Sequence, residues 1–409
     1  MRFVMLTTFY PPFNFGGDGI DVQRTARALV RRGHQVTVVH DVDAYQWLAH
    51  RTHPEQPVMQ DGVEVIGLRS RFGVLSSLLT HQLGRPVMHG RAIARIIRER
   101  APQVIVFHNV SLVGGPALLG YGGDALKIYV AHEHWLVCPT HVLWKFNSEP
   151  CDAKACTSCV LSYRRPPQLW RYTGALDRRV GDVDLFLARS EFSKAKHAQF
   201  GFPRDMRVWP LFLPDDLAAE PRPVSPHPRP YFLFVGRLAR IKGVHAIIPA
   251  FASYPSADLV VVGDGDELDA LKAQARDVPN VRFVGSVSNE AIGDYYRHAV
   301  ALILPSVGYE TFGTVLLEAF RYGTPVVARR IGPLPEIVDQ SQGGVLFSTN
   351  DELIAAMDKL QRDPALRAAL AANGLAAAKQ RWSEEAVIGR FLEMTHEALA
   401  AKREERQSA

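Results

Sequence analysis

Two carboxylates at a fixed spacing, Glu310 and Glu318, are the residues of this 409-residue chain best placed to do chemistry. An apolar run at 300–304 precedes them, turn residues follow it, and helix-like spacing begins near Thr314. A helix N-terminus binds anions, because its first N–H groups lack intrahelical partners and the helix dipole adds positive potential. Glu318 lies about one turn into that helix and can face the same ligand from the side. The spacing predicts a site for a phosphate flanked by sugars.

Two cations, Arg237 and Lys242, follow a second predicted strand at 231–235. Both lie on one loop, after Gly236 and before a helical pattern at 244–254. Surface cations are usually just solvated. A reaction that leaves charge on a departing phosphate, however, needs cations or preorganised dipoles at that point. Two cations on one loop beyond a strand are therefore candidates for contact with a phosphate.

A glycine-rich loop with Gly16, Gly17 and Gly19 follows the first predicted strand, residues 2–7. It lacks the G-x-G-x-x-G spacing of a dinucleotide-binding loop. Taken alone it is a turn between a strand and a helix, although the N–H groups of Gly16 and Gly17 are available to an anion.

Two Asp-x-Asp pairs have the spacing of a metal-holding motif: Asp41 with Asp43, and Asp182 with Asp184. We interpret both as structural, because the first ends a predicted strand and the second begins one. No catalytic metal is expected at either pair.

All four cysteines fall in one segment, 137–163: Cys138, Cys151, Cys156 and Cys159. The Cys-x2-Cys pair at its end is a common metal knuckle, and clustering in an intracellular protein favours metal over disulfide. The segment predicts a structural zinc held by four thiolates, with iron–sulfur, a disulfide or no metal as alternatives.

Composition places few limits on function. The chain is 47% hydrophobic and 22% charged with a net charge of +5, which is ordinary for a soluble protein and does not indicate nucleic-acid binding. No apolar run is long enough to cross a bilayer. The N-terminal apolar stretch is short and a Pro pair follows it, so it predicts a strand rather than a signal peptide. We expect a cytoplasmic protein.

Strands and helices alternate in both halves of the chain, which predicts an α/β fold with two doubly wound parallel sheets. The expected units are an N-terminal domain at 1–213, a Pro-rich linker at 214–230 and a C-terminal domain at 231–382. A final helix at 383–409 is expected to pack back toward the N-terminal domain. Ligands in such sheets sit beyond the carboxyl ends of the strands, where every loop named above falls.

These motifs together resemble glycosyltransferase family 4, retaining enzymes with the two-domain GT-B fold in which two Rossmann-like domains face a central cleft. The resemblance covers nearly the whole chain. It rests on Glu310-x7-Glu318 with Thr311-Phe312-Gly313, on Phe234-Val235-Gly236-Arg237-Leu238 with Lys242-Gly243, and on Val261-Val262-Gly263-Asp264-Gly265. Tyr10-Pro11-Pro12 and Arg32-Gly33-His34 in the first half fit as well.

The resemblance implies roles for individual residues. Arg237 and Lys242 would bind the donor diphosphate, Glu318 the ribose and Glu310 the donor sugar. His132, at the end of a predicted strand, would lie near the reacting sugar, although a lone His at a strand end is often simply packed. The implied catalytic residues are His132, Glu310, Arg237 and Lys242, and the implied donor-binding residues are Gly16, Gly17, Arg237, Lys242, Val287, Glu310, Thr311, Phe312, Gly313, Thr314 and Glu318.

The implied activity is transfer of a hexose-like sugar from a UDP-, GDP- or other nucleotide sugar to a glycan, lipid-linked or small-molecule acceptor, with retention. This fits biosynthesis of cell-surface polysaccharides or glycoconjugates. Two alternatives stay open: a disaccharide synthase or phosphorylase of the same fold, and an inactive scaffold carrying a metal–thiolate module.

A basic and aromatic segment, 163–179, follows the cysteines, and the helix predicted at 87–100 carries four arginines. These are either solvated faces or a peripheral contact with the inner face of a membrane or a lipid-linked acceptor.

Overall fold

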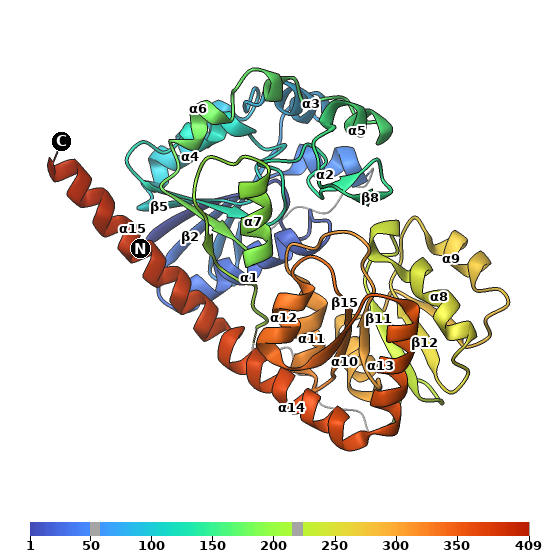
Figure 1. Cartoon of the computed structure of the whole chain (residues 1–409). Coiled ribbons are helices and arrows are strands. Elements are labelled where there is room, and N and C mark those ends of the chain that lie inside the picture. The colour runs from blue at the N-terminus through green and yellow to red at the C-terminus, as the bar shows by residue number, and fades with distance from the viewer. Residues whose placement is uncertain (50–57, 215–223, 409) are drawn as a thin grey trace.

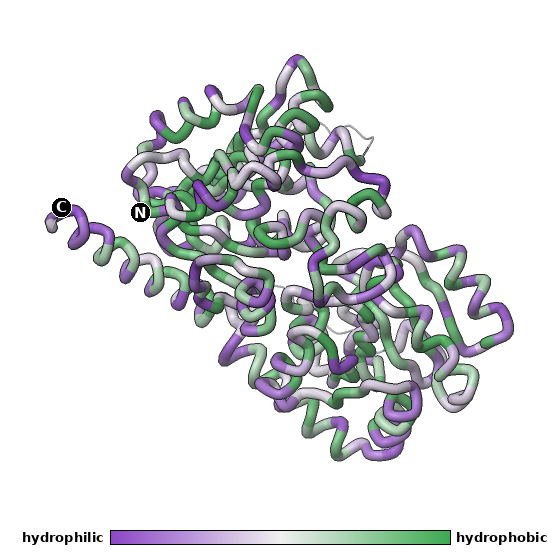
Figure 2. The backbone as a smooth tube through the Cα atoms, turned by 45° about the horizontal axis from the view of Figure 1, so that its top comes forward, coloured by the Kyte–Doolittle hydropathy of each residue, from purple (hydrophilic) through white to green (hydrophobic). Residues whose placement is uncertain are grey.

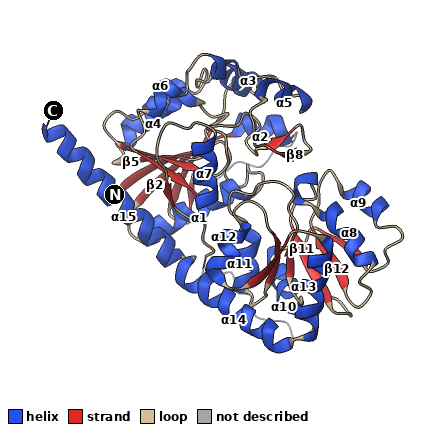
Figure 3. Cartoon of the chain, viewed as in Figure 1, coloured by secondary structure: helices blue, strands red, loops and turns tan. Residues whose placement is uncertain are grey.

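The computed structural model describes residues 1–49, 58–214 and 224–408 as two α/β domains, one above the other in Figure 1. The α/β prediction is confirmed. Residues 215–223 of the predicted linker lie outside the described residues. Figure 3 shows a large sheet in each domain with helices on its faces.

The N-terminal sheet has the strand order β10-β9-β6-β5-β1-β2-β4-β3. Its strands pair in parallel except β3, which runs antiparallel to β4. The strands are β1 (Arg2–Leu6), β2 (Gln35–Asp41), β3 (Met59–Gln60), β4 (Val63–Leu68), β5 (Val104–Phe107), β6 (Leu126–Ala131), β9 (Leu185–Ala188) and β10 (Arg207–Val208). The helices are α1 (Gly17–Arg31), α2 (Val42–Ala49), α3 (Val74–Leu83), α4 (Gly90–Arg100), η1 (Pro116–Gly120), η2 (Leu169–Tyr172), α6 (Asp177–Val180) and α7 (Glu191–Gln199).

The C-terminal sheet is parallel throughout, in the order β13-β12-β11-β14-β15-β16. Its strands are β11 (Tyr231–Val235), β12 (Asp258–Val262), β13 (Val281–Gly285), β14 (Leu302–Leu304), β15 (Val326–Arg329) and β16 (Gly344–Phe347). The helices are η4 (Arg240–Lys242), α8 (Val244–Ala252), α9 (Leu268–Gln274), α10 (Asn289–His298), α11 (Thr314–Arg321), α12 (Leu334–Ser341), α13 (Asn350–Arg362), α14 (Pro364–Arg381) and α15 (Glu384–Ser408).

Strand order reverses at β11, which lies between β12 and β14. Such a switch point opens a crevice at the carboxyl ends of the strands, because the neighbouring connections leave on opposite faces. The loops that carry the two predicted cations and the first carboxylate leave β11 and β14 here. The fold therefore brings together two segments that are about 70 residues apart in the chain.

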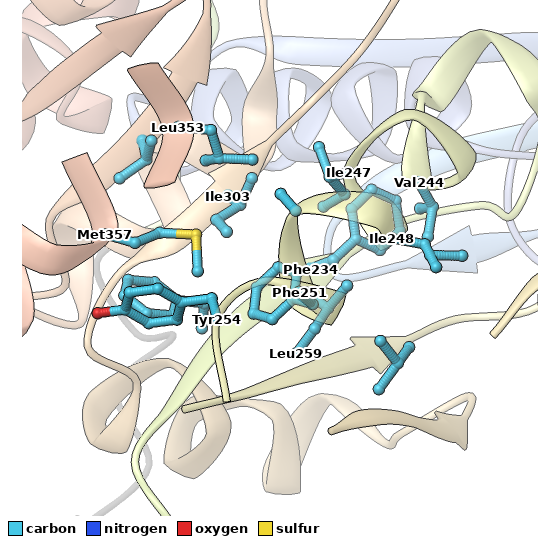
Figure 4. Close-up of a cluster of buried hydrophobic side chains, with 14 of the residues drawn as sticks. Phe234, Val244, Ile247, Ile248, Phe251, Tyr254, Leu259, Ile303, Leu353 and Met357 are labelled. Carbon is cyan, nitrogen blue, oxygen red and sulfur yellow. The ribbon is translucent and has the colours of Figure 1, made fainter. Parts of the chain in front are cut away.

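A buried apolar layer holds these strands in place. Phe234, Ile248, Phe251 and Leu353 pack together behind the sheet (Figure 4). Each is at most 1% exposed, and burying such a side chain contributes about 1.5–3 kcal/mol. Figure 2 shows hydrophobic stretches inside both domains and hydrophilic ones along the outer helices.

The last helix, α15, runs from the C-terminal domain along the N-terminal domain (Figure 1). Near its start, Glu384 pairs with Arg32 at 2.8 Å, and the Val387 carbonyl accepts a hydrogen bond from the Trp209 indole at 2.9 Å. Further along, Lys402 pairs with Asp184 at 2.7 Å. This helix joins the two domains in addition to the linker.

The cysteine segment forms a small unit of its own, with the antiparallel pair β7 (Trp144–Lys145) and β8 (Glu149–Pro150) and the helix α5 (Cys156–Ser162).

Among the described residues, none of the helices combines the length and apolar character that a bilayer span requires.

Candidate active site

Lys242 and Glu310, predicted from separate motifs, are in direct contact. The Lys242 ammonium donates to both carboxylate oxygens of Glu310, at 2.7 and 2.9 Å. The buried Ser306 hydroxyl donates to Glu310 Oε1 at 2.8 Å. Two loops from adjacent strand ends therefore meet in one charged cluster at the switch point.

The backbone fixes the spacing between these loops. The Ile241 carbonyl accepts hydrogen bonds from the N–H groups of Val307 at 2.9 Å and Gly308 at 3.3 Å. Gly243 adopts φ 76°, and a Cβ there would lie 2.1 Å from the Pro305 carbonyl oxygen. Only glycine permits this approach, so Gly243 lets the Lys242 loop dock against the Glu310 loop.

Electrostatics keep Glu310 ionised. Burial raises the pKa of its carboxyl, but the ammonium of Lys242, the Ser306 hydrogen bond and the positive charge of Arg237 together outweigh burial and lower that pKa. The Arg237 side chain is exposed. Arg237 is thus near enough to act on Glu310 electrostatically and is still accessible to a ligand.

The pKa of Glu318 is shifted in the opposite direction, above its ordinary value. Burial raises the pKa of its carboxyl, although a hydrogen bond from Tyr296 and the charge of Arg24 lower it. The Tyr296 hydroxyl donates to Glu318 Oε2 at 2.7 Å. Through this hydrogen bond Tyr296, which lies on α10, orients the carboxylate that the family resemblance assigns to the ribose.

The loop before α11 makes the predicted helix start. Gly313 caps α11 with φ 109°, and Thr314 is the first helical residue. The Ser190 hydroxyl of the N-terminal domain donates to the Thr311 carbonyl at 2.8 Å, while Phe312 is buried against Trp382. The start of α11 therefore lies next to Ser190 of the N-terminal domain.

His132 lies in a buried cluster. Its Nε2 is 2.8 Å from His108 Nδ1, and its Nδ1 is 3.3 Å from Arg189 Nη2 and 3.6 Å from Asp21 Oδ2. Arg189 is 1% exposed, pairs with Asp21, and lies 4.4 Å from the Trp209 ring. Burial, and then the charges of Arg189 and His108, lower the pKa of His132 well below its usual value, so His132 is neutral.

This environment limits what His132 can do. A neutral imidazole next to an arginine can accept a hydrogen bond from a sugar hydroxyl or donate one to it, but it is a weak base and binds a proton poorly. Both ring nitrogens already lie within hydrogen-bond distance of protein groups, so a ligand hydroxyl would have to replace one of them.

The remaining predicted donor residues lie on other loops. Gly16 caps α1 with φ 72°, and both Gly16 and Gly17 are exposed at the start of that helix. Val287 lies just after β13 and packs partly buried against the core behind Phe312.

The four cysteines are reduced in this structure. Burial, and then the neighbouring thiols of Cys138, Cys156 and Cys159, raise the pKa of Cys151 to about 11, so the thiols lie in one neighbourhood. The structure does not, however, gather them at metal-binding distances: within the described ranges, the His, Cys, Asp or Glu group whose ligand atoms all lie within 4.8 Å is a different one, described below.

The cysteine segment contacts the loop that carries Glu310 directly. The Tyr309 hydroxyl donates to Asp152 at 2.8 Å, and the Lys196 ammonium donates to the same carboxylate oxygen at 2.9 Å. Lys196 also lies 4.5 Å from the centre of the Tyr309 ring. We call Asp152, Lys196 and Tyr309 the strap, because it joins both domains next to Glu310.

Sequence reasoning missed several of these residues. Arg189 follows β9 at its carboxyl end, the same position that identified His132, and could have been found in that way. Asp21 lies within the buried face of α1, and Tyr296 is spaced like a core residue of α10, so no local signal distinguishes them.

The basic and aromatic segment is only partly exposed. Trp170 is 3% exposed, and the Arg171 guanidinium lies 4.4 Å from its ring and donates to the Trp135 carbonyl at 2.6 Å. These two residues pack inside the domain, whereas Arg164, Arg165 and Tyr172 face solvent.

Two family models match the chain in succession. "Glycosyltransferase Family 4" matches residues 15–217, and "Glycosyl transferases group 1" matches residues 218–376. An uncharacterised glycosyltransferase of Methanocaldococcus jannaschii is 33% identical over 94% of this chain and 95% of its own length. A glycogen synthase of Mycobacterium tuberculosis is 29% identical over 100% of this chain and 96% of its own.

Solved structures agree on the fold. Sucrose-phosphate synthase of Thermosynechococcus elongatus matches with a TM-score of 0.72 and 20% identity, over 98% of this chain and 99% of that one. The Anabaena protein HepE in complex with UDP-glucose matches with a TM-score of 0.65 and 19% identity, over 97% of this chain and 100% of that one. The chain belongs to the family 4 glycosyltransferases and has the GT-B fold.

Proposed function

We propose that this glycosyltransferase moves a hexose-like sugar from a nucleotide diphosphate-sugar to an acceptor with retention of anomeric configuration. The observation that carries the proposal is the charged cluster at the switch point, where Lys242 and the exposed Arg237 flank Glu310. One HepE structure carries UDP-glucose, and that protein shares the fold of this chain.

In this mechanism, Arg237 and Lys242 bind the diphosphate and offset the charge that grows on the leaving phosphate. The N–H groups at Gly313 and Thr314 add the positive end of the α11 dipole. No divalent metal is required at the diphosphate, because the cations and helix dipole supply the compensating charge.

The carboxylates position the rest of the donor. Glu318, held by Tyr296, accepts hydrogen bonds from the vicinal hydroxyls of a ribose. Glu310, held by Lys242 and Ser306, accepts from hydroxyls of the transferred sugar. The acceptor attacks from the face that the phosphate leaves, and a phosphate oxygen takes the acceptor proton, so retention needs no protein nucleophile.

The cysteine segment is proposed to bind a structural zinc. Four thiolates leave no open coordination position, so the metal would stabilise residues 137–163 rather than react. The four thiols would have to converge on the metal, because the structure does not gather them at metal-binding distances. Metal analysis of protein purified without chelators should give near one zinc per chain, and loss of the zinc should lower the melting temperature. A folded, active protein without metal would exclude this role.

We also propose contact with an anionic membrane that carries a lipid-linked acceptor. Several large apolar side chains from α3 and from the segment beside it are exposed: Phe72, Val74, Leu75, Leu83, Leu161, Leu169 and Tyr172, each at 43–62%. Arg71, Arg164 and Arg165 lie among them in the sequence and are exposed. Apolar side chains with interleaved cations suit the interface of an anionic bilayer. Failure of anionic liposomes to retain the protein at low salt would exclude this contact.

Donor binding is tested first by thermal shift against UDP-, GDP-, ADP- and dTDP-sugars. A donor at 100-fold over its dissociation constant should stabilise the fold by about 2.7 kcal/mol. The bound donor is then incubated with glycan, lipid-linked and sugar-phosphate acceptors, and the anomeric configuration of the product is read by NMR. Donor binding that is unchanged in both Lys242→Met and Glu318→Ala would overturn the proposed site.

A further inference from the structure

Three buried groups outside the proposed donor site converge at the end of β2. Asp41 is the last residue of β2, Asp43 lies in the first turn of α2, and His89 immediately precedes α4. Their exposed fractions are 0%, 3% and 3%. Within the described ranges, the ligand atoms of these three residues all lie within 4.8 Å of one another.

The separations are close to the edges of a tetrahedral metal coordination shell. His89 Nε2 lies 3.3 Å from Asp43 Oδ2 and 3.7 Å from Asp41 Oδ1. Metal–oxygen and metal–nitrogen bonds of about 2.0–2.2 Å in a tetrahedron place neighbouring ligand atoms about 3.3–3.6 Å apart.

The His89 nitrogen is aimed between the carboxylates without completing a hydrogen bond to either. Among the described residues, His89 Nε2 and Asp41 Oδ2 are buried atoms without a hydrogen-bond partner, and such atoms carry a desolvation penalty that a ligand would remove. The carboxylates themselves are oriented by the backbone, because Asp41 Oδ1 accepts from Ala44 N–H at 3.0 Å and Asp43 Oδ2 from Ser70 N–H at 2.8 Å. These are the outer contacts that fix metal ligands.

The formal charges of the three side chains also favour a bound cation. Two buried carboxylates carry two negative charges, and a protonated His89 balances one of them. A divalent cation with a neutral histidine would neutralise the site completely.

We propose that Asp41, Asp43 and His89 form a second metal site, which binds one divalent cation and is distinct from the donor diphosphate and the cysteine segment. Two carboxylates and one imidazole suit Mn²⁺, Fe²⁺ or Zn²⁺. The sequence interpretation of Asp41-x-Asp43 as purely structural did not include His89, which lies 46 positions further along the chain and supplies the third ligand.

The second Asp-x-Asp pair provides the contrast. Asp182 and Asp184 have the same spacing but pair with Arg179 at 3.1 Å and Lys402 at 2.7 Å. Cations of the protein already neutralise them, so they attract no metal.

A cation bound at this site would hold neighbouring residues in place and would not take part in the sugar transfer. Asp41 N–H donates to the Thr8 carbonyl at 3.1 Å, and Thr8 N–H donates to the Asn109 carbonyl. Asn109 follows His108, the hydrogen-bond partner of His132. A cation at Asp41 would therefore hold the strand ends that carry the His132 cluster.

Mn²⁺ alone is the probe, because carboxylate and imidazole accept it whereas thiolates favour softer metals. The full-length protein is freed of weakly bound metal with EDTA, and Mn²⁺ is titrated without nucleotide while free Mn²⁺ is followed by EPR. We expect one Mn²⁺ per chain, at least tenfold weaker binding in Asp43→Asn and His89→Gln, and unchanged binding in the matched control Asp182→Asn. Absence of Mn²⁺ binding, or equal binding in all four proteins, overturns the proposal.

A second measurement needs no variant. Pulsed EPR on the Mn²⁺ complex of the unaltered protein should show a ¹⁴N hyperfine coupling from His89. Bound Mn²⁺ without nitrogen coupling overturns this ligand set even if the variants fail to fold. Neither experiment involves the donor, so its result is independent of the proposed sugar transfer.

Discussion

The two domains share one fold but hold their charges differently. On the C-terminal side, Lys242 and Glu310 pair at the ends of adjacent strands with side chains 27% and 18% exposed. On the N-terminal side, Arg189 and Asp21 pair with at most 6% exposed. The pair on the C-terminal side is accessible to solvent, whereas the buried pair is part of the domain's interior.

This difference predicts that the accessible pair serves ligand binding and that the buried pair serves the stability of its domain. A buried ion pair is costly to break, because removal of one partner leaves the other charge desolvated. We therefore expect variants on the N-terminal side to lose stability first, and variants on the C-terminal side to lose activity first.

The largest effect is expected from Arg189→Ala. Removal of the guanidinium leaves Asp21 buried without its partner, so the free energy of unfolding should fall by about 3–5 kcal/mol. Chemical denaturation measures this directly. Arg207→Ala is the control, because its pair with Glu397 is 44% and 62% exposed and should contribute less than about 1 kcal/mol. Equal losses in the two variants would contradict the comparison.

Lys242→Met should reduce kcat by about 10²–10³-fold, the cost of removing one donor that faces developing charge. The free energy of unfolding should change far less than in Arg189→Ala, since Glu310 keeps the Ser306 hydrogen bond and lies next to Arg237. Steady-state kinetics with the identified donor provide the measurement. Arg240→Ala, an exposed cation on the same short helix, should keep full activity, and a loss there as large as at Lys242 would show that general charge matters rather than position.

A pH-dependent difference is expected for Asp18, which accepts a hydrogen bond from Asn109. Burial, and then the charge of Glu133, raise the pKa of Asp18 to about 6. The folded state therefore holds this proton between about pH 4 and 6 while the unfolded state releases it, so stability from this group falls as pH rises through that window. Asp18→Asn should gain melting temperature relative to the unaltered protein from pH 4 to pH 7. The exposed Asp205→Asn should show no such trend, and parallel curves for all three proteins would refute the prediction.

The smallest effect is expected at the strap. Tyr309→Phe keeps the ring near Lys196 and Phe192 but removes the hydrogen bond to Asp152, a loss of about 0.5–1.5 kcal/mol. The donor KM should rise by at most about tenfold with little change in kcat. Tyr172→Phe removes a hydroxyl that pairs with Thr157 at the surface and should leave KM unchanged. If both variants behave alike, the strap does not position the donor loop.

Local sequence was sufficient for the C-terminal half of the site. A strand, a short glycine-containing loop and a helix start lie within about fifteen residues at Glu310, so spacing alone places the carboxylates and the free N–H groups. The Arg237 and Lys242 loop has the same organisation. The helix predicted at residue 87, however, begins at Gly90, because Pro86 and the residues after it first form a turn closed by Gly90 N–H.

Contacts across long separations could not be obtained in this way. Asp21 and Arg189 are 168 residues apart, and Tyr309 and Asp152 are 157 apart. Each of these residues has an ordinary local pattern, and its partner is chosen only when the sheet order brings the strand ends together. The same applies to His89 beside Asp41 and Asp43.

The amino-acid sequence by itself determined the fold class, the family and the strand–loop–helix arrangement around Glu310, because periodicity, glycine placement and helix starts are local properties of a chain. Tertiary structure decided which charges are accessible and which are buried in pairs. Ionisation, ligand access and metal-binding capacity depend on desolvation and on neighbours from distant segments, and those exist only in the folded chain.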